Sequence, residues 1–419
     1  MKYIISVKTG AKTGIPVYLL VFLFLLVLSC EQDKNNKQYE YYLSSQKLKS
    51  ISVEQAKSVL GLLKLTNPEA QDIIDKILYN TDVYKIVYKT KFKGSEIKAS
   101  GIICVPVASG SFPLLSFQNG TNILKSDAPS LSLFNPMYTL LQSMSGNGYI
   151  ILMPDYLGFG ESGQILHPYY HRESSDASVI DLINASDEFL SDNEVSATGN
   201  NKLFLMGYSQ GGWATLSALE SLESDPYETK DIMAASCGAG AYDVVETARY
   251  ILQLDMYPAP FYLPYFIESH IRNGFLDESL QKYFNEPYAS RIPELFDGTK
   301  SGGAINAELN DSVSVLVTSG LWQNFDTGSD FLTLREDLGI NSVAAWPSGK
   351  MLMFFHGEAD DNVPSFESHN IYNAFRQQGL TAEQVQLVTV DSLNHDTGLI
   401  PWGLSTIKWF NEIKSSVSK

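Results

Sequence analysis

Cysteine is scarce in this 419-residue sequence, which has only Cys30, Cys104 and Cys237. Cys30 stands at the end of an N-terminal apolar run, so only two cysteines remain for the rest of the chain. Both lie among apolar or small residues, where cysteine commonly acts as a small hydrophobic side chain. A disulfide-based scaffold is therefore excluded, and we assign no chemistry to Cys104 or Cys237.

Positive charge is also in short supply, with 30 Lys and Arg residues against 47 Asp and Glu and a net charge of −17. Proteins that bind nucleic acid need a basic surface, so nucleic acid is excluded as a partner. The sequence has no zinc signature, phosphate-binding loop or dinucleotide-binding glycine motif beside its predicted strands. We therefore predict neither a metal site nor an organic cofactor. Nothing in the sequence predicts an oligomeric state.

A long apolar run occurs once, from Ile15 to Leu28, after a basic stretch that extends to Lys12. It is shorter than the roughly 20 residues of a spanning helix and fits a signal peptide. The run ends in Leu28-Ser29-Cys30, which resembles the lipobox at which bacterial lipoproteins are cleaved and acylated. We predict a signal peptide over residues 1–29, lipidation at Cys30 and a polar tether over 30–50. The protein would then be exported and anchored to a membrane of the bacterial cell envelope. The sequence does not indicate which face of the membrane carries the anchor.

Beyond the tether, the apolar pattern predicts an α/β fold. Two alternating segments between Val83 and Val107, separated by Lys93-Gly94-Ser95, predict an antiparallel hairpin. Continuous apolar runs, typical of strands buried on both faces, then alternate with helical patterns. These runs cover residues 113–117, 149–153, 203–206, 232–235, 351–355 and 385–390. We predict a mostly parallel central sheet with helices on both faces.

Residues 242–346 interrupt this alternation between the sixth and the seventh predicted strands. They predict a cap or lid inserted into a core that spans 51–241, including N-terminal helices, and 347–419. The start of the cap, 256–266, carries many aromatic residues between three prolines. Such residues either line an apolar pocket or fill the core of the cap itself.

The motif that carries chemistry is Gly207-Tyr208-Ser209-Gln210-Gly211. It joins an apolar strand to a helical run at 213–219, the setting of a nucleophile elbow, in which a sharp turn exposes a serine. Side chains two positions before and after Ser209 would collide with neighbouring backbone, which explains both glycines. We predict Ser209 as the nucleophile and the Gln210 N–H, at a helix start, as the first oxyanion donor.

A serine nucleophile needs a histidine base, and the base needs an acid that orients it. Of six histidines, only His395 follows the last predicted strand, where chain order places the base. The acid should follow the strand at 351–355, where Glu358, Asp360 and Asp361 are all acceptable. Spacing alone does not choose among them.

The second oxyanion donor should follow the third predicted strand, at 113–117. The candidates there are the backbone N–H groups of Asn119, Gly120 and Thr121. Gly120 would allow the chain to approach a substrate closely, because it has no side chain.

The sequence resembles the α/β-hydrolase superfamily from about Tyr84 to Lys414. It is most similar to the secretory lipase family and its bacterial relatives. The residues that carry this similarity are 116–121, 154–162, 167–169 and 207–212. The resemblance implies a helical cap after the sixth strand, esterase or lipase activity and no cofactor. Residues 357–364 match a G-x-x-D-x-x-V-P signature, which places the acid on Asp360, while Asn119 stands where many relatives have histidine.

We therefore expect a serine hydrolase that cleaves carboxylic esters through an acyl-enzyme on Ser209, with a small-molecule or lipid ester as substrate. The ester could be a glyceride or a polysaccharide ester. A serine peptidase on the same fold is one alternative, because the same catalytic groups can attack amides. A catalytically inactive binding protein of the envelope is another.

Overall fold

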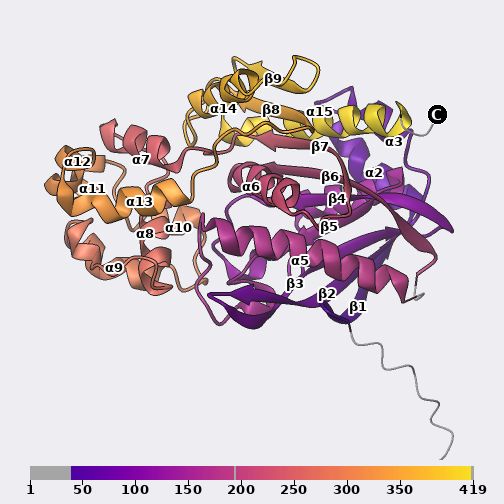
Figure 1. The fold of residues 1–419 in the computed structure, drawn as a ribbon, viewed down its shortest axis with the longest axis horizontal. Helices are drawn as coiled ribbons and strands as arrows, with labels where there is room; N and C mark the ends of the chain where they lie inside the picture. The colour runs from indigo at the N-terminus through magenta and orange to yellow at the C-terminus, as the bar shows by residue number, and fades with distance from the viewer. Residues whose placement is uncertain (1–38, 193–194, 417–419) are drawn as a thin grey trace, which may run out of the picture. The chain divides into compact units, whose positions relative to one another are not determined.

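The computed structural model describes residues 39–192 and 195–416. Their centre is a nine-stranded sheet of order β1-β2-β3-β5-β4-β6-β7-β8-β9 (Figure 1). The strands are β1 (Tyr42–Ile51), β2 (Thr81–Phe92), β3 (Ser95–Pro106), β4 (Gly110–Gln118), β5 (Ile150–Pro154), β6 (Ala197–Tyr208), β7 (Asp231–Gly238), β8 (Met351–Gly357) and β9 (Val385–Val390). Strands β4 to β9 pair in parallel, whereas β1, β2 and β3 pair antiparallel to their neighbours. The predicted mostly parallel sheet is confirmed.

The predicted hairpin is formed by β2 and β3, which are joined by Lys93 and Gly94. Both residues have positive φ, 52° and 76°, as a two-residue turn between twisted strands requires. Glycine adopts this backbone conformation without strain, so the Lys93-Gly94 pair fixes the register of the hairpin.

The prediction of a tether over residues 30–50 is wrong from Tyr42 onward, because Tyr42–Ile51 forms edge strand β1 against β2. Most side chains of β1 are exposed or half-buried, and only Ile51 is buried. An edge strand with little burial has no apolar pattern to reveal it, although its backbone pairs with β2. The predicted signal peptide and Cys30 lie outside the described residues.

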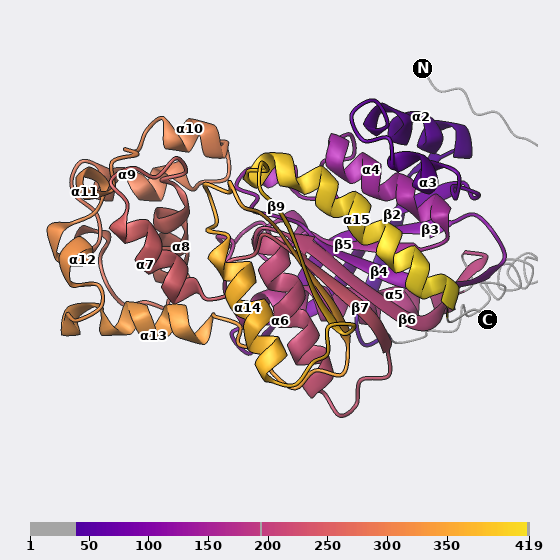
Figure 2. The same cartoon turned by 90° about the horizontal axis from the view of Figure 1, so that it is seen from above.

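Helices cover both faces of the sheet (Figure 2). The core helices are α2 (Val53–Leu63), α3 (Ala70–Ile74), α4 (Pro136–Met144), α5 (Arg172–Ser191), α6 (Gln210–Ser224), α14 (Phe366–Gln377) and α15 (His395–Ser416). Helices α5, α6 and α14 contribute to one hydrophobic cluster, and α2, α3, α4 and α15 to another. Successive residues of β6 belong alternately to the two clusters. Leu203 and Leu205 lie in the first, and Phe204 and Met206 lie in the second. Its continuous apolar run therefore reflects burial on both faces.

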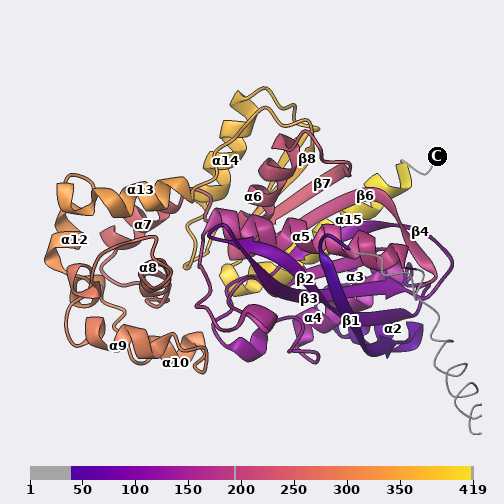
Figure 3. The ribbon, with the colours of Figure 1, turned by 60° about the horizontal axis from the view of Figure 1, so that its bottom comes forward.

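The inserted segment forms a helical group between β7 and β8 (Figure 3). Its helices are α7 (Val244–Gln253), α8 (Tyr262–Arg272), α9 (Tyr288–Leu295), α10 (Gly302–Asn306), α11 (Val313–Leu316), α12 (Ser319–Asn324) and α13 (Leu332–Ile340). The insertion follows the seventh strand of the chain rather than the sixth, because β1 adds a strand that the sequence pattern does not show. Within residues 39–192 and 195–416, no helix combines the length and apolar character of a membrane span.

Candidate active site

Ser209 occupies a strained turn between β6 and α6, with φ 60° and ψ −126°. The two flanking glycines allow this turn. A Cβ on Gly207 would lie 2.1 Å from the Gly211 carbonyl oxygen, and one on Gly211 would lie 1.9 Å from the Gln118 carbonyl oxygen of β4. The collisions predicted from the sequence are therefore present on both sides of the serine, and the strain fixes where its hydroxyl points.

A continuous hydrogen-bonded chain leads away from this hydroxyl. Ser209 Oγ lies 2.9 Å from His395 Nε2, and His395 Nδ1 lies 2.7 Å from Asp360 Oδ2. Ser209 and His395 are only 8% and 7% exposed, and the Asp360 carboxylate is fully buried. The fold thus brings together three side chains from the ends of β6, β8 and β9, in the arrangement that removes a proton from a serine.

Asp360 is the one of the three candidate acids that contacts His395. Its Oδ1 accepts hydrogen bonds from the Asn362 and Val363 N–H groups at 2.9 and 2.8 Å. Burial alone would raise the pKa of Asp360, but hydrogen bonds from His356 and His395 outweigh it and hold the pKa well below its usual range. The carboxylate is therefore ionised beside the imidazole.

The two other acids of this loop are engaged elsewhere or exposed. Glu358 accepts a hydrogen bond from His369 Nε2 at 2.8 Å, and the Asp361 side chain lies at the surface. Spacing in the sequence could not distinguish Glu358, Asp360 and Asp361, because they lie within four residues of one another. The direction in which each side chain leaves the loop distinguishes them.

The predicted oxyanion donors lie on both sides of Ser209. Gln210 is the first residue of α6, so its N–H has no acceptor within the helix. On the other side, a Cβ on Gly120 would lie 3.6 Å from the Ser209 Cβ and 3.3 Å from the Tyr208 carbonyl oxygen. Asn119, Gly120 and Thr121 all line the cavity at Ser209, so the loop is close enough for a backbone N–H to reach a bound oxyanion.

The chain is similar to a known protein family and to solved structures of other hydrolases. A family model described as the prolyl oligopeptidase family matches residues 136–251. A provisionally assigned hydrolase from Legionella pneumophila is 27% identical, with a TM-score of 0.79 over 90% of this chain and 98% of that chain. The chain belongs to the α/β-hydrolase superfamily.

More distant structures share the α/β-hydrolase fold. The rice cell wall degrading esterase LipA from Xanthomonas oryzae, in a ligand-bound form, is 23% identical, with a TM-score of 0.72 over 85% of this chain and 92% of that one. Candida antarctica lipase A in its closed state is 14% identical, with a TM-score of 0.63 over 86% and 78% of the two chains. No curated protein matches the sequence. The relatives leave open which bond this α/β-hydrolase cleaves.

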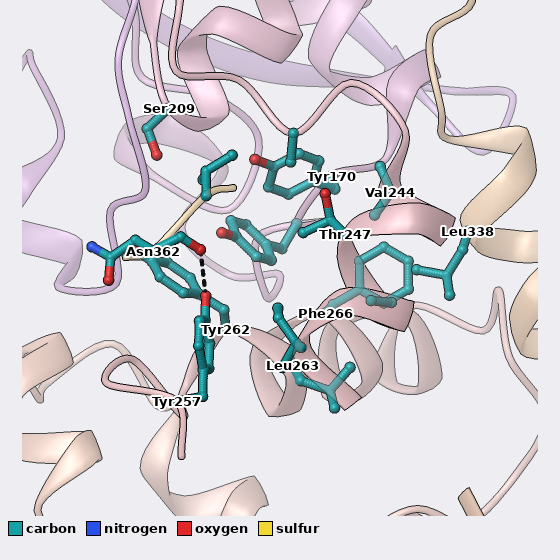
Figure 4. Close-up of a pocket in the computed structure, with 15 residues that line it drawn as sticks. Tyr170, Ser209, Val244, Thr247, Tyr257, Tyr262, Leu263, Phe266, Leu338 and Asn362 are labelled. Atoms are coloured by element: carbon teal, nitrogen blue, oxygen red, sulfur yellow. Dashed lines mark hydrogen bonds between the residues drawn. The ribbon is translucent and has the colours of Figure 1, made fainter. Parts of the chain in front are cut away.

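Two cavities meet at Ser209. The first lies beneath the cap and has an almost entirely apolar lining (Figure 4). Its cap residues include Ala248, Tyr257, Tyr262, Leu263 and Phe266. The aromatic segment at the start of the cap therefore serves partly as a pocket lining, one of the two roles left open by its sequence. It also packs within the cap, where Tyr265 stacks on Phe296 with the ring centroids 4.9 Å apart.

The second cavity also borders Ser209, and its lining is more polar. Its lining includes Asn119, Thr121, Asn122, Asn135 and Asp396. A substrate that reacts at Ser209 would thus have an apolar space for one of its parts and a space with hydrogen-bonding groups for the other.

His356 is a member of the site that the sequence did not predict. It is fully buried at the end of β8. Its Nδ1 lies 2.7 Å from Ser368 Oγ, and its Nε2 lies 3.1 Å from the Val363 carbonyl oxygen and 3.2 Å from Asp360 Oδ2. It holds the loop that carries the acid. Its place at a strand end, four residues before Asp360, was the only signal in the sequence.

Proposed function

We propose that the protein is a serine hydrolase of carboxylic esters, with Ser209 as nucleophile, His395 as general base and acid, and Asp360 as the group that orients the imidazole. One observation carries this proposal. The Ser209 hydroxyl is hydrogen-bonded to His395 at the junction of an apolar and a more polar cavity. An ester has an acyl part and an alcohol part, joined by the bond that is cleaved, and each could occupy one of the two cavities.

In this mechanism, His395 Nε2 takes the proton of Ser209 as the oxygen attacks the ester carbonyl. The carbonyl oxygen becomes negatively charged and is stabilised by the Gln210 N–H and a backbone N–H from Asn119, Gly120 or Thr121. The imidazolium returns its proton to the departing alkoxide, which leaves as an alcohol. Water, deprotonated by the same imidazole, then attacks the acyl-enzyme. The bond between the acyl carbon and Ser209 Oγ breaks, the acid is released, and the imidazolium returns its proton to Ser209.

The relatives support an ester substrate in two different settings. The Xanthomonas protein is a cell wall degrading esterase, and the Candida protein is a lipase. The apolar cavity beneath the cap suits the acyl part of the ester, and the more polar cavity suits its alcohol part. A peptidase is the second candidate, because the prolyl oligopeptidase model matches residues that include Ser209.

The test is a series of nitrophenyl esters from acetate to palmitate, with peptide nitroanilides assayed in parallel. We expect ester hydrolysis that Ser209→Ala abolishes, together with labelling of the wild-type protein, but not of the variant, by a fluorophosphonate. The position of the maximum in the series separates an esterase from a lipase. Cleavage of the amides with no turnover of any ester would replace our proposal with the peptidase. No labelling of folded protein would favour an inactive binding protein.

We also propose that the protein is exported and held at a bacterial membrane by lipid on Cys30, as the lipobox-like residues indicate. In a bacterial host, Cys30→Ser should move the protein from the membrane fraction to the soluble fraction and remove the acyl groups from its N-terminus. Cys237→Ala, which keeps Cys30, should leave the protein with the membrane. Unchanged fractionation and mass of the Cys30→Ser protein would refute the anchor.

A further inference from the structure

The loop between β5 and α5, residues 155–171, contacts both segments of the predicted oxyanion hole. Tyr156 donates a hydrogen bond of 3.3 Å to the Asn119 carbonyl oxygen, and the hydroxyls of Tyr169 and Thr121 share one of 2.8 Å. His167 Nε2 lies 2.9 Å from the side-chain Nε2 of Gln210. This loop, which we call the support loop, thus touches both the 119–121 loop and the first turn of α6.

The contact from His167 has a defined direction. Its Nδ1 lies 2.7 Å from the Leu157 carbonyl oxygen, which can only accept, so Nδ1 carries the proton. Nε2 then offers a lone pair to the Gln210 amide. Burial lowers the pKa of His167 to about 4, so the ring stays neutral and keeps this lone pair at neutral pH. The buried Gln210 Oε1 has no hydrogen-bond partner among the described residues, so His167 supplies the contact that orients the amide.

The support loop leaves little freedom to His167. Gly158 has φ 92°, and a Cβ there would lie 2.4 Å from the His167 backbone nitrogen. The imidazole also stacks beside Tyr156, with centroids 5.7 Å apart and an interplanar angle of 17°. The close approach of Gly158 to the His167 backbone and the stacking of Tyr156 on its ring both limit the movement of the imidazole.

The same loop is bound by the cap through helix α8. The Tyr169 N–H donates to Ser269 Oγ at 3.2 Å, and His270 Nε2 lies 2.9 Å from the Tyr169 carbonyl oxygen. The ring of Tyr169 stacks on that of Tyr265, with centroids 4.4 Å apart. Tyr169 therefore contacts the cap with its backbone and ring and the 119–121 loop with its hydroxyl.

We propose that His167 and Tyr169 are positioning residues of the oxyanion hole and that they couple its geometry to cap helix α8. The inference rests on the proposed function, because it assumes that Ser209 reacts through an oxyanion. The proposed role of His167 needs no contact with substrate. Tyr169 also lines the apolar cavity, but its proposed role depends on the contact of its hydroxyl with Thr121. His167 fixes the residue that carries the first donor, and Tyr169 fixes the loop that carries the second. Since an oxyanion hole acts mainly in the transition state, loss of its alignment lowers kcat more than it changes KM.

The test compares His167→Phe, which keeps a ring without an acceptor, with His167→Gln, which restores one. Tyr169→Phe removes a single hydroxyl, and Tyr227→Phe, at an exposed tyrosine, is the matched control. We expect His167→Phe and Tyr169→Phe to lower kcat about tenfold or more with KM changed less than about twofold. His167→Gln should recover part of the loss, and Tyr227→Phe should have no effect.

A double-mutant cycle that combines His167→Phe with Gln210→Ala tests whether His167 acts through the Gln210 side chain. If His167 acts through the Gln210 side chain, the double variant should lose no more activity than the more impaired single variant. The rate at which a fluorophosphonate labels Ser209 should fall in parallel, and this readout does not depend on the ester chosen. Unchanged kcat and labelling in His167→Phe and Tyr169→Phe would overturn the inference while ester hydrolysis by the wild type stands. Should His167→Phe not fold, Tyr169→Phe and Gln210→Ala decide the result.

Discussion

At the scale of single residues, the site depends on direction more than on residue type. Asp360 Oδ2 faces His395, whereas the neighbouring Asp361 faces solvent. Asp360 is also held by two backbone N–H groups and by His356, so its carboxylate is fixed before a substrate binds. A fixed, ionised acid keeps the imidazole in the tautomer that accepts the serine proton.

Replacement of Asp360 by Asn should keep the geometry of the site while it removes the negative charge beside His395. We expect Asp360→Asn to fold and to lower kcat by about 10⁴-fold, the size of effect seen when an amide imposes the wrong histidine tautomer. The measurement is kcat for a nitrophenyl ester at pH 7, with circular dichroism to check the fold. Asp361→Asn is the matched control and should keep wild-type kcat. An equal loss in both variants would contradict the assignment of the acid.

At the scale of elements, each chemical group sits at the end of a strand or the start of a helix. Ser209 follows β6, Asp360 follows β8, and His395 begins α15 after β9. Parallel strands place these ends on one edge of the sheet, where the cap helices also lie. The core elements thus supply the reacting groups, and cap helices α7 and α8 supply much of the apolar cavity.

Helix α7 should therefore control the length of the acyl chain. Ala248 lies on this helix and lines the apolar cavity, so Ala248→Phe should fill part of it. We expect hydrolysis of long-chain nitrophenyl esters to fall at least about tenfold, with acetate hydrolysis changed less than about threefold, because an extra or missing group in an apolar pocket is worth about 1–3 kcal/mol.

The matched control is Ala304→Trp on α10, at an exposed cap position. It should leave the whole ester series unchanged. A uniform loss across all chain lengths in Ala248→Phe would indicate damage to the core or cap rather than a shorter acyl cavity.

At the scale of the whole molecule, one buried acid joins the cap to the core. Glu367 of α14 accepts hydrogen bonds from the Asp243 N–H at 2.8 Å and from the Thr247 hydroxyl at 2.9 Å, at the point where the chain enters the cap. Burial raises the pKa of Glu367 to about 8. The acid is therefore protonated in the folded protein at neutral pH.

This acid should make stability depend on pH. Because its folded pKa lies above its unfolded value, its contribution is complete below the unfolded pKa and is lost as pH rises to about 8. We expect the melting temperature of the wild type to fall between pH 5 and pH 8 by more than that of Glu367→Gln. The amide cannot ionise, and it can accept from the Asp243 N–H through its oxygen while its NH2 group donates to the Thr247 hydroxyl oxygen. Glu336→Gln, at an exposed cap position, should behave as the wild type does. Parallel pH profiles for the wild type and Glu367→Gln would contradict this role.

The sequence by itself determined the features that rest on adjacent residues. The apolar runs of β4 to β8 reflect burial on both faces, whereas edge strand β9 buries only Val385, contrary to the expectation for residues 385–390. The elbow at Ser209 needs only a strand, two glycines and a helix in direct succession. The role of Gly207 and Gly211 could be inferred because a side chain at either position would collide with atoms of the sharp turn or of the neighbouring strand. The long interruption between β7 and β8 likewise marked the cap.

The tertiary structure decided what depends on direction and on partners distant in sequence. Strand β1 is stabilised by pairing with β2 rather than by burial, so its polar side chains gave no signal. Asp360 differs from its neighbours only in where its carboxylate points, and His356 matters only because β8 places it behind that carboxylate. The support loop reaches the oxyanion residues through contacts across long sequence separations. Such contacts follow from the packing of the folded chain, which local periodicity does not encode.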